Sequence, residues 1–280
     1  MKDSGRPYAE VIGDPISQSK SPAIHNFWLR KLGIDAEYRT CQVLTAELAD
    51  YYERRRVDPH WRGCNVTIPH KVATLGLVDV ADEIARSTGA ANTVIPTGNG
   101  LSATNTDIDG ILAALPEALM PPGSEVCILG TGGAARAAFA ACKRRNVALV
   151  LNSARNQDAG LELLREFGFG GTNRSLDDAH NIQTAHVIIN ATSLGMVGKG
   201  PFPPAILDYL KYPMPDAVVF DMVYAPLETA LLQTARAHGL RTVDGLAMLI
   251  GQAAVAFEKF FGVAPPRDDG DAELRKRLTA

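Results

Sequence analysis

Residues 125–144 have the sequence EVCILGTGGAARAAFAACKR. The apolar run Val126–Leu129 predicts a buried strand over residues 125–129, and the small residues from Ala134 to Arg144 predict a helix that starts directly after the glycines. Glycine allows a sharp turn and a close approach of the backbone to a pyrophosphate, which the free N–H groups at the helix start stabilise. The alternative is a structural turn that binds nothing. We predict a dinucleotide-binding turn made of Gly130, Thr131, Gly132, Gly133 and Ala134.

Further apolar runs of strand length follow this turn at residues 148–151, 187–190 and 218–221. Helix-length segments separate them, and a further strand is expected between residues 151 and 187. Parallel strands alternating with helices are typical of a doubly wound nucleotide-binding sheet. Residues 116–244 are therefore predicted to form a dinucleotide-binding domain with a Rossmann-like fold.

The amino-terminal part of the chain also alternates strand and helix patterns, for example at residues 9–13 and 23–32. Pro116, Pro121, Pro122 and Gly123 interrupt this pattern and indicate a domain boundary. Near the carboxyl end, apolar residues recur at helical spacing over residues 245–261, and this helix is expected to pack on the first domain. The predicted fold class is α/β with two domains. Residues 1–115 and 245–280 are expected to form an α/β substrate-binding domain.

Composition narrows the range of functions. A chain of 280 residues with 46% apolar content can bury two ordinary cores. Its 28 basic and 31 acidic residues are spread along the chain, so neither nucleic acid nor a membrane surface is an expected partner. No apolar run approaches the roughly 18 residues of a membrane span, and no leader segment is recognised. The four cysteines lack metal-ligand spacing, so we expect no metal and reduced thiols in a cytoplasmic protein. The sequence does not determine the oligomeric state, and a monomer or a homodimer is expected.

Cofactor choice depends on the end of the strand that follows the glycine turn. An acidic residue there would bind the ribose 2′-hydroxyl of NAD, but this chain has Asn152, Ser153 and then Arg155. Arginine is suited to bind a 2′-phosphate, and a serine hydroxyl can add a hydrogen bond. NADP is therefore the predicted cofactor. NAD remains the alternative, in which Arg155 is a solvated residue at a helix start.

Polar residues in the first domain suggest acid–base chemistry. Oxidising an alcohol requires its O–H proton to leave as the hydride leaves carbon, and Lys71 and Asp107 are candidate acid–base groups. Asn65 and Thr67 would share one face of an extended segment that precedes Lys71. A lone lysine is usually a solvated charge, so only the neighbouring residues support this role.

Two serines precede a predicted helix in the same domain. Pro22 would occupy the first position of that helix, so Ser21 is a possible N-cap. Ser19 is not needed for capping and is expected to offer its hydroxyl to a ligand.

Several motifs together resemble the shikimate dehydrogenase family. In chain order they are Ser19–Asn26 (SKSPAIHN), Asn65–Lys71 (NVTIPHK), Gly89–Thr93 (GAANT), Asn105–Gly110 (NTDIDG), Asn190–Met196 (NATSLGM), Asp221–Pro226 (DMVYAP) and Asp244–Ala253 (DGLAMLIGQA). The resemblance spans roughly residues 13–261. It implies an NADP-dependent oxidoreductase of the chorismate pathway of aromatic amino acid biosynthesis, which usually reduces 3-dehydroshikimate to shikimate.

The resemblance also implies roles for individual residues. Lys71 and Asp107 are similar to the family's catalytic pair. A cyclic polyol carboxylate is the implied ligand, and hydroxyl and amide side chains can match its ring oxygens without an arginine. The expected substrate contacts are Ser19, Ser21, Asn65, Thr67, Asn92, Tyr224 and Gln252. Thr192, Met222 and Gly245, within the matching motifs, are counted with the cofactor contacts.

The chain departs from the family pattern at two points. Many NADP-using members have Asn-Arg-Thr where this chain has Asn152, Ser153 and Ala154, and Gln18 replaces a common histidine. Quinate differs from shikimate by a hydrated double bond, which a pocket discriminates weakly. The alternatives are therefore a dehydrogenase of quinate or another cyclic polyol that uses NAD, and a nucleotide-binding regulator without catalysis.

Overall fold

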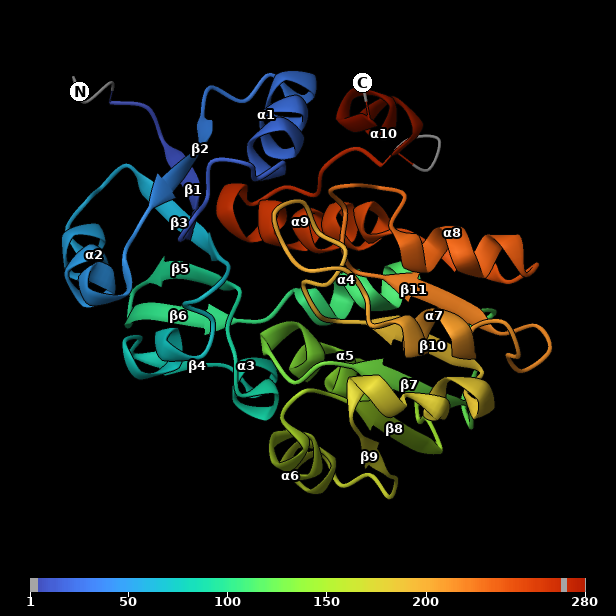
Figure 1. The fold of residues 1–280 in the computed structure, drawn as a ribbon. Coiled ribbons are helices and arrows are strands. Elements are labelled where there is room, and N and C mark those ends of the chain that lie inside the picture. The colour runs from blue at the N-terminus through green and yellow to red at the C-terminus, as the bar shows by residue number, and fades with distance from the viewer. Residues whose placement is uncertain (1–4, 268–270, 280) are drawn as a thin grey trace. The chain divides into compact units, whose positions relative to one another are not determined.

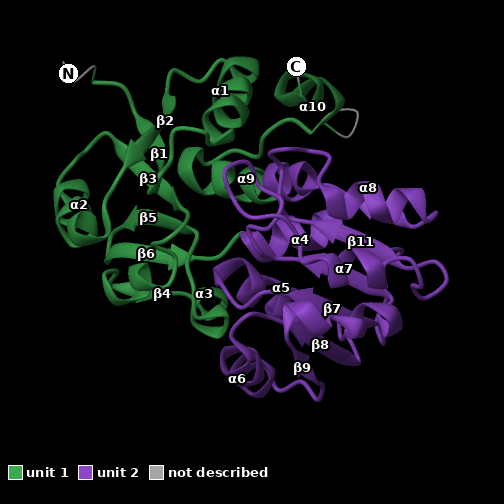
Figure 2. Cartoon of the chain, in the orientation of Figure 1, with its two compact units in different colours: residues 1–106, 252–280 green, residues 107–251 purple. Residues whose placement is uncertain are grey.

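The computed structural model describes residues 5–267 and 271–279 (Figure 1). The chain forms two compact units, which Figure 2 shows in different colours. Unit 1 contains residues 1–106 and 252–280, and unit 2 contains residues 107–251. Each unit has its own six-stranded sheet. The predicted α/β class with two sheets is confirmed.

The sheet of unit 2 is parallel throughout, in the order β12-β11-β10-β7-β8-β9. Its strands are β7 (Glu125–Leu129), β8 (Leu149–Ser153), β9 (Asn173–Arg174), β10 (Val187–Asn190), β11 (Val218–Asp221) and β12 (Arg241–Val243). Counted from β7 as strand 1, the order is 3-2-1-4-5-6, which is the order of Rossmann sheets. Strand order reverses between β7 and β10, and ligands of such sheets bind at the carboxyl ends of the strands there. The glycine turn follows β7 and lies at this point.

Helices alternate with the strands of unit 2 and cover its sheet. They are α4 (Asp107–Ala114), α5 (Gly133–Arg144), α6 (Gln157–Phe167), α7 (Pro204–Tyr209), α8 (Ala230–Ala237) and the first part of α9 (Gly245–Phe261), with the 3-10 turns η3 (Leu176–Asp178) and η4 (His180–Thr184). Helix α5 packs on β7, α6 on β8 and α8 on β11. The strands β7, β10 and β11 have the predicted bounds, because each is an uninterrupted apolar run buried on both faces. The weakly marked strand between residues 151 and 187 is β9, which has only two residues.

The sheet of unit 1 is mixed, in the order β2-β1-β3-β5-β6-β4. Its strands are β1 (Tyr8–Gly13), β2 (Glu37–Gln42), β3 (Trp61–Val66), β4 (Val80–Ala81), β5 (Thr93–Thr97) and β6 (Gly100–Thr104). Strand β1 pairs in parallel with β2 and β3, whereas β5 pairs antiparallel with both β3 and β6. The alternation of strands and helices predicted for this part holds for β1, α1 (Ser21–Leu32), β2, α2 (Leu48–Arg56) and β3, and the β5–β6 hairpin adds antiparallel strands to the sheet. Gly98 and Asn99 form a two-residue hairpin loop, which can join only antiparallel neighbours.

The helices of unit 1 contribute aromatic side chains to its core. They are α1 (Ser21–Leu32), α2 (Leu48–Arg56), α3 (Glu83–Thr88), α10 (Ala272–Thr279) and the remainder of α9, with the 3-10 turns η1 (Thr45–Glu47) and η2 (Ala73–Gly76). Helix α9 has the predicted bounds. Phe257 on α9 lies 5.5 Å from Trp28 on α1 between ring centroids, so the carboxyl-terminal part of α9 packs in the core of unit 1 as expected.

The boundaries between the two units differ from the boundary that Pro116, Pro121, Pro122 and Gly123 indicate. The chain passes between units at residues 106/107 and 251/252, so residues 107–115 and 245–251 belong to unit 2. Helix α4 packs on α5, and Asp109 pairs with Arg144 at 3.0 Å. Prolines mark where the chain turns, whereas packing of the α4 surface decides which unit the helix joins.

Two further properties concern the described residues alone. No helix within residues 5–267 and 271–279 combines the length and the apolar character that crossing a membrane would need. The same residues contain no group of three or more His, Cys, Asp or Glu side chains placed to hold a metal ion, and all four cysteines are free thiols.

Candidate active site

The glycine turn has the geometry that the sequence predicts. Gly130 has φ +107°, and a Cβ there would lie 2.9 Å from the Thr192 side chain, so only glycine is accommodated. Gly132 is the N-cap of α5, and a Cβ built on it would meet nothing within 4 Å. The start of this 12-residue helix therefore faces open space. Its free N–H groups and positive dipole end can accept a pyrophosphate.

The Asn152 side chain holds the backbone at the start of the glycine turn. Its side chain is fully buried, and Nδ2 donates to the carbonyl oxygens of Ile128 and Gly130, both at 2.9 Å. The backbone N–H of Gly130 in turn donates to the carbonyl oxygen of Ser153 at 2.8 Å. Asn152 thus fixes the end of β7 and the first residue of the turn. The sequence indicated a direct cofactor contact, but this geometry shows a supporting contact.

The other residues at the end of β8 divide between interior and surface. Ser153, which the sequence predicts to bond the 2′-phosphate, is fully buried, so its hydroxyl is not exposed to solvent. Arg155 is exposed in the turn before α6, whose N-cap is Asn156. Arg155 is therefore the residue of this segment that can reach a ligand in solvent.

Asn190 and Asp221, at the ends of β10 and β11, organise the loops that carry other predicted site residues. Asn190 Nδ2 donates to Asp221 Oδ1 at 2.8 Å, and Asn190 Oδ1 accepts from the backbone and hydroxyl of Thr192 at 3.0 and 2.7 Å. Asp221 also accepts from the Val223 N–H and the Thr229 hydroxyl. Burial raises the pKa of Asp221. Both residues lie in recognisable sequence motifs, but their supporting role was not predicted because it depends on strand neighbours.

The segment after β11 carries Met222 and Tyr224, and α9 begins at Gly245, shortly after β12. A Cβ at Gly245 would lie 2.4 Å from the Met222 carbonyl oxygen, so Gly245 lets α9 start against the segment after β11. Burial raises the pKa of Tyr224, and its hydroxyl therefore stays protonated and able to donate. Asp107 is the first residue of α4 and is buried at 5% exposure. All four predicted residues belong to unit 2.

Seven predicted residues belong to unit 1, and they gather at one edge of its sheet. Parallel strands β1 and β3 end at the same edge, and the loops after them carry Ser19 and Lys71. The start of β5 lies beside the end of β3, where Asn65 pairs with Thr93 in the ladder. The predicted site residues that belong to unit 1 are Ser19, Ser21, Asn65, Thr67, Lys71, Asn92 and Gln252.

The turn that carries Lys71 is held on both sides. Thr67 N–H donates to the Ile12 carbonyl at 2.9 Å, and Ala91 N–H donates to the Lys71 carbonyl at 2.8 Å. The buried His70 ring contacts the Val43 carbonyl at 2.7 Å through Nε2. Lys71 therefore stands on a fixed turn after β3.

The loop that carries Ser19 and leads to Ser21, called the serine loop here, caps helix α1 in a different way from the one expected. The N-cap of α1 is Lys20, and Ser21 is the first helical residue, so Ser21 is not the cap. Ser19 Oγ instead accepts the Ser21 N–H at 3.3 Å. Ser19, expected to have no capping role, thus bonds the start of α1, whereas the side-chain hydroxyl of Ser21 does not serve as its cap.

Buried amides form a hydrogen-bonded cluster at the same edge. Asn92 Nδ2 donates to Thr106 Oγ1 at 3.0 Å and to Gln252 Oε1 at 3.4 Å, and its Oδ1 accepts the Thr106 N–H at 2.7 Å. Asn65 joins through Thr93 Oγ1 at 3.1 Å. Three of these residues were predicted and are joined by one network, while Thr106 and Thr93 were missed.

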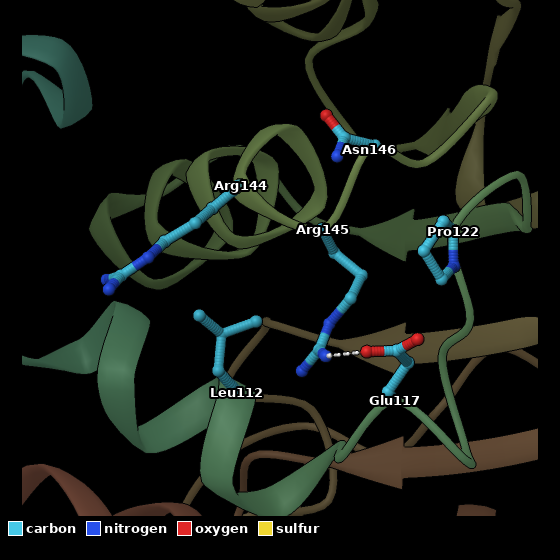
Figure 3. A pocket seen from close by; sticks show the side chains of 6 residues that line it. All are labelled: Leu112, Glu117, Pro122, Arg144, Arg145 and Asn146. Carbon is cyan, nitrogen blue, oxygen red and sulfur yellow. Dashed lines mark ion pairs between the residues drawn. The ribbon is translucent and has the colours of Figure 1, made fainter.

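A surface pocket on unit 2 contains none of the predicted site residues (Figure 3). Its volume is about 260 Å³, and its lining residues are Leu112, Glu117, Pro122, Arg144, Arg145 and Asn146. Arg145 points toward Glu117 at 3.8 Å and donates to the Leu115 carbonyl, whereas Arg144 points away from Glu117. Acidic partners already neutralise both arginines, so this pocket is a poor anion site.

Comparisons with known proteins agree with this geometry. Residues 11–94 match the family profile described as the shikimate dehydrogenase substrate binding domain, and residues 245–275 match the shikimate 5′-dehydrogenase C-terminal domain. A protein of Sphingopyxis alaskensis named shikimate dehydrogenase (NADP(+)) is 49% identical over 275 residues, which cover 98% of this chain and 97% of that protein.

Solved structures share the whole fold. Shikimate 5-dehydrogenase from Thermus thermophilus, crystallised with NADP(H) and shikimate, has a TM-score of 0.85 at 31% identity and covers 97% of this chain and 99% of its own. The ligand-free 5-ketofructose reductase of Gluconobacter sp. strain CHM43 has a TM-score of 0.81 at 28% identity, covering 97% and 99%. The fold alone therefore does not select the substrate. Sequence identity over nearly the full length does select the family, and this chain belongs to the shikimate dehydrogenase family.

Proposed function

We propose that this chain is an NADP-dependent shikimate dehydrogenase that interconverts shikimate and 3-dehydroshikimate. The observation that carries this function is the 49% identity, over 98% of the chain, to a protein named for that activity. Unit 1 supplies most of the proposed substrate contacts, whereas unit 2 supplies Tyr224 and the dinucleotide turn. Cytoplasmic action as a monomer or homodimer forms part of the proposal, and the four free thiols support a reducing compartment.

Lys71 and Asp107 are proposed as the catalytic pair. When NADP is bound, its nicotinamide supplies or accepts the hydride. Lys71 exchanges the proton of the reacting hydroxyl, since that proton must leave when the alcohol is oxidised and return when the ketone is reduced. Asp107 is proposed to accept a hydrogen bond from the reacting hydroxyl and so to orient it. The fixed turn around Lys71 supports this role, because proton transfer depends on position.

The substrate carboxylate and ring hydroxyls require different partners. Ser19, Ser21 and Tyr224 can donate hydrogen bonds to a carboxylate, and the raised pKa of Tyr224 keeps it a donor. Thr67, Asn65, Asn92 and Gln252 offer hydroxyl and amide groups to the ring oxygens. No arginine is needed for such a site, because neutral donors can satisfy a carboxylate.

A four-way turnover assay tests the proposed function. Shikimate and quinate are each offered with NADP+ and with NAD+, and the rate of reduced cofactor formation is followed. The proposal expects the highest kcat/KM for shikimate with NADP+. Faster turnover of quinate would indicate the related polyol dehydrogenase. A purified, folded protein without turnover in any combination would indicate a nucleotide-binding regulator.

Arg155 is proposed to recognise the 2′-phosphate. Arg155→Ala removes a charge-assisted contact, so we expect KM for NADP+ to rise about tenfold while KM for NAD+ changes less than twofold. Arg165 is an exposed arginine on helix α6, the helix that follows Arg155. Arg165→Ala is the matched control and should leave both values unchanged. Equal KM values for NADP+ in wild type and Arg155→Ala would assign 2′-phosphate recognition to another residue.

A further inference from the structure

Tyr38 lies on the edge strand β2 of unit 1 and is fixed at three points. Its backbone N–H donates to Asn26 Oδ1 at 3.0 Å, and its carbonyl oxygen accepts from Asn26 Nδ2 at 2.7 Å. Its ring stacks on His25, with centroids 3.9 Å apart and planes inclined by 6°. Its hydroxyl lies 2.6 Å from Asn65 Oδ1. The residue is 1% exposed, so every group of Tyr38 has a defined partner inside unit 1.

His25 and Asn26 supply two of these contacts from helix α1. Asn26 occupies the outer backbone groups of Tyr38, where a further strand would otherwise pair. Burial lowers the pKa of His25 to about 3, so the ring that stacks on Tyr38 is a neutral imidazole. The His-Asn pair at the end of the SKSPAIHN motif therefore fixes a tyrosine rather than a ligand.

The direction of the hydrogen bonds around Asn65 follows from its neighbours. Asn65 Nδ2 lies 3.3 Å from the Asn92 carbonyl oxygen and 3.1 Å from Thr93 Oγ1. A backbone carbonyl only accepts hydrogen bonds, so the NH₂ group of Asn65 must face Asn92 and its oxygen must face Tyr38. Tyr38 is consequently the donor to Asn65 Oδ1. Both amide hydrogens of Asn65 are used, and one lone pair of its oxygen remains.

We propose that Tyr38 is a positioning residue for substrate recognition, which holds Asn65 as a pure hydrogen-bond acceptor toward a ring hydroxyl. This inference rests on the proposed function and deepens it. A substrate group that faces Asn65 must donate, so a hydroxyl is accepted there and a carboxylate is opposed. The substrate carboxylate therefore binds at the loop that carries Ser19 and Ser21. Because the carboxylate and one hydroxyl then have fixed partners, the orientation of the ring is fixed as well.

Tyr38→Phe tests this role, because it removes the hydroxyl and keeps the ring that stacks on His25. Titration calorimetry measures shikimate binding to the full chain without cofactor, so that no turnover contributes heat, and NADP+ binding is measured separately without shikimate. We expect the Kd for shikimate to rise about tenfold, since Asn65 Oδ1 loses its buried donor, while the Kd for NADP+ stays unchanged. In turnover, KM for shikimate should rise by the same factor, and kcat should fall less.

Two further variants separate positioning from general loss of structure. Tyr51 is equally buried at 1% exposure and donates to Glu10 at 2.8 Å, so Tyr51→Phe removes a matched hydroxyl that bonds no predicted site residue. It should leave shikimate binding unchanged. Asn65→Ala should bind shikimate as weakly as the Asn65→Ala/Tyr38→Phe double variant, because Tyr38 acts only through Asn65.

The outcomes distinguish this inference from the proposed function. Shikimate turnover by the wild type, measured in the same series, tests the function alone. Unchanged shikimate binding in Tyr38→Phe overturns the positioning role, as do equal losses of shikimate and NADP+ affinity. Losses that multiply in the double variant also overturn it, since they would show that Tyr38 acts independently of Asn65.

Discussion

Replacing Lys71 by methionine is expected to lower kcat for shikimate oxidation about 10³-fold, within the range for loss of a general acid–base group. Methionine keeps an unbranched side chain of similar length, so the turn around residue 71 is preserved. The lysine is proposed to act on the proton that moves in the transition state. We therefore expect kcat and kcat/KM to fall by the same factor while KM for shikimate changes little. Steady-state kinetics with saturating NADP+ measures both values.

The control for Lys71 is a lysine that is removed in the same way elsewhere in unit 1. Lys31, in the last turn of α1, pairs with Glu273 at 3.3 Å. Lys31→Met should retain kcat within about twofold. Lys31 is not a predicted site residue, and a surface ion pair contributes little to the stability of the fold. If the Lys71→Met variant keeps more than about a third of wild-type kcat, Lys71 does not carry out the proton transfer.

The largest expected loss of stability concerns Arg55 and the buried carboxylate of Glu10. Glu10 is fully buried in β1, and its Oε1 accepts from Arg55 Nε at 2.6 Å and from the Tyr51 hydroxyl at 2.8 Å. Arg39 reaches Oε2 at 3.2 Å. Arg55→Met keeps the aliphatic packing but leaves the carboxylate short of its nearest cation. Breaking a buried pair in this way costs about 3 kcal/mol of unfolding free energy.

Tryptophan fluorescence measures the loss of stability in unit 1, the unit that contains Glu10 and Arg55. The chain has two tryptophans, Trp28 and Trp61, and both are buried in unit 1. Urea unfolding followed by their emission should show a lower midpoint for Arg55→Met and an unchanged m-value. Arg56→Met, the neighbouring residue, whose partners Glu53 and Asp79 are exposed, should shift the midpoint only slightly. Equal shifts for the two variants would show that the Glu10 cluster does not stabilise unit 1 specifically.

Local patterns were sufficient where a segment is buried on all sides or has a single amphipathic face. Strands β7, β10 and β11 are continuous apolar runs, and α9 repeats apolar residues at helical spacing, so their bounds could be predicted. The two-residue strands β4 and β9 have no such pattern, because so short a segment is extended only through its neighbours. Gly98 and Asn99, which join β5 to β6, are a local sequence signal for this hairpin.

Side-chain direction limited the prediction of the cofactor site. Asn152 and Ser153 follow the strand in the expected place, but both side chains face the interior. Alternation along β8 gives two possible faces, and which face meets solvent depends on the helices that cover the sheet. Arg155 lies beyond the strand, where no sheet face constrains it, and it is exposed.

The sequence by itself determined the two-sheet α/β class, the dinucleotide turn after β7 and the family, because these depend on local spacing and on motifs whose order along the chain is sufficient. The tertiary structure decided that Asn152 supports Gly130, that Asn190 meets Asp221, and that Tyr38 holds Asn65. Each of these contacts joins residues that are 22 to 31 positions apart. Hydrogen-bond partners on different strands of a sheet depend on strand order and register, which only the packing of the whole chain establishes.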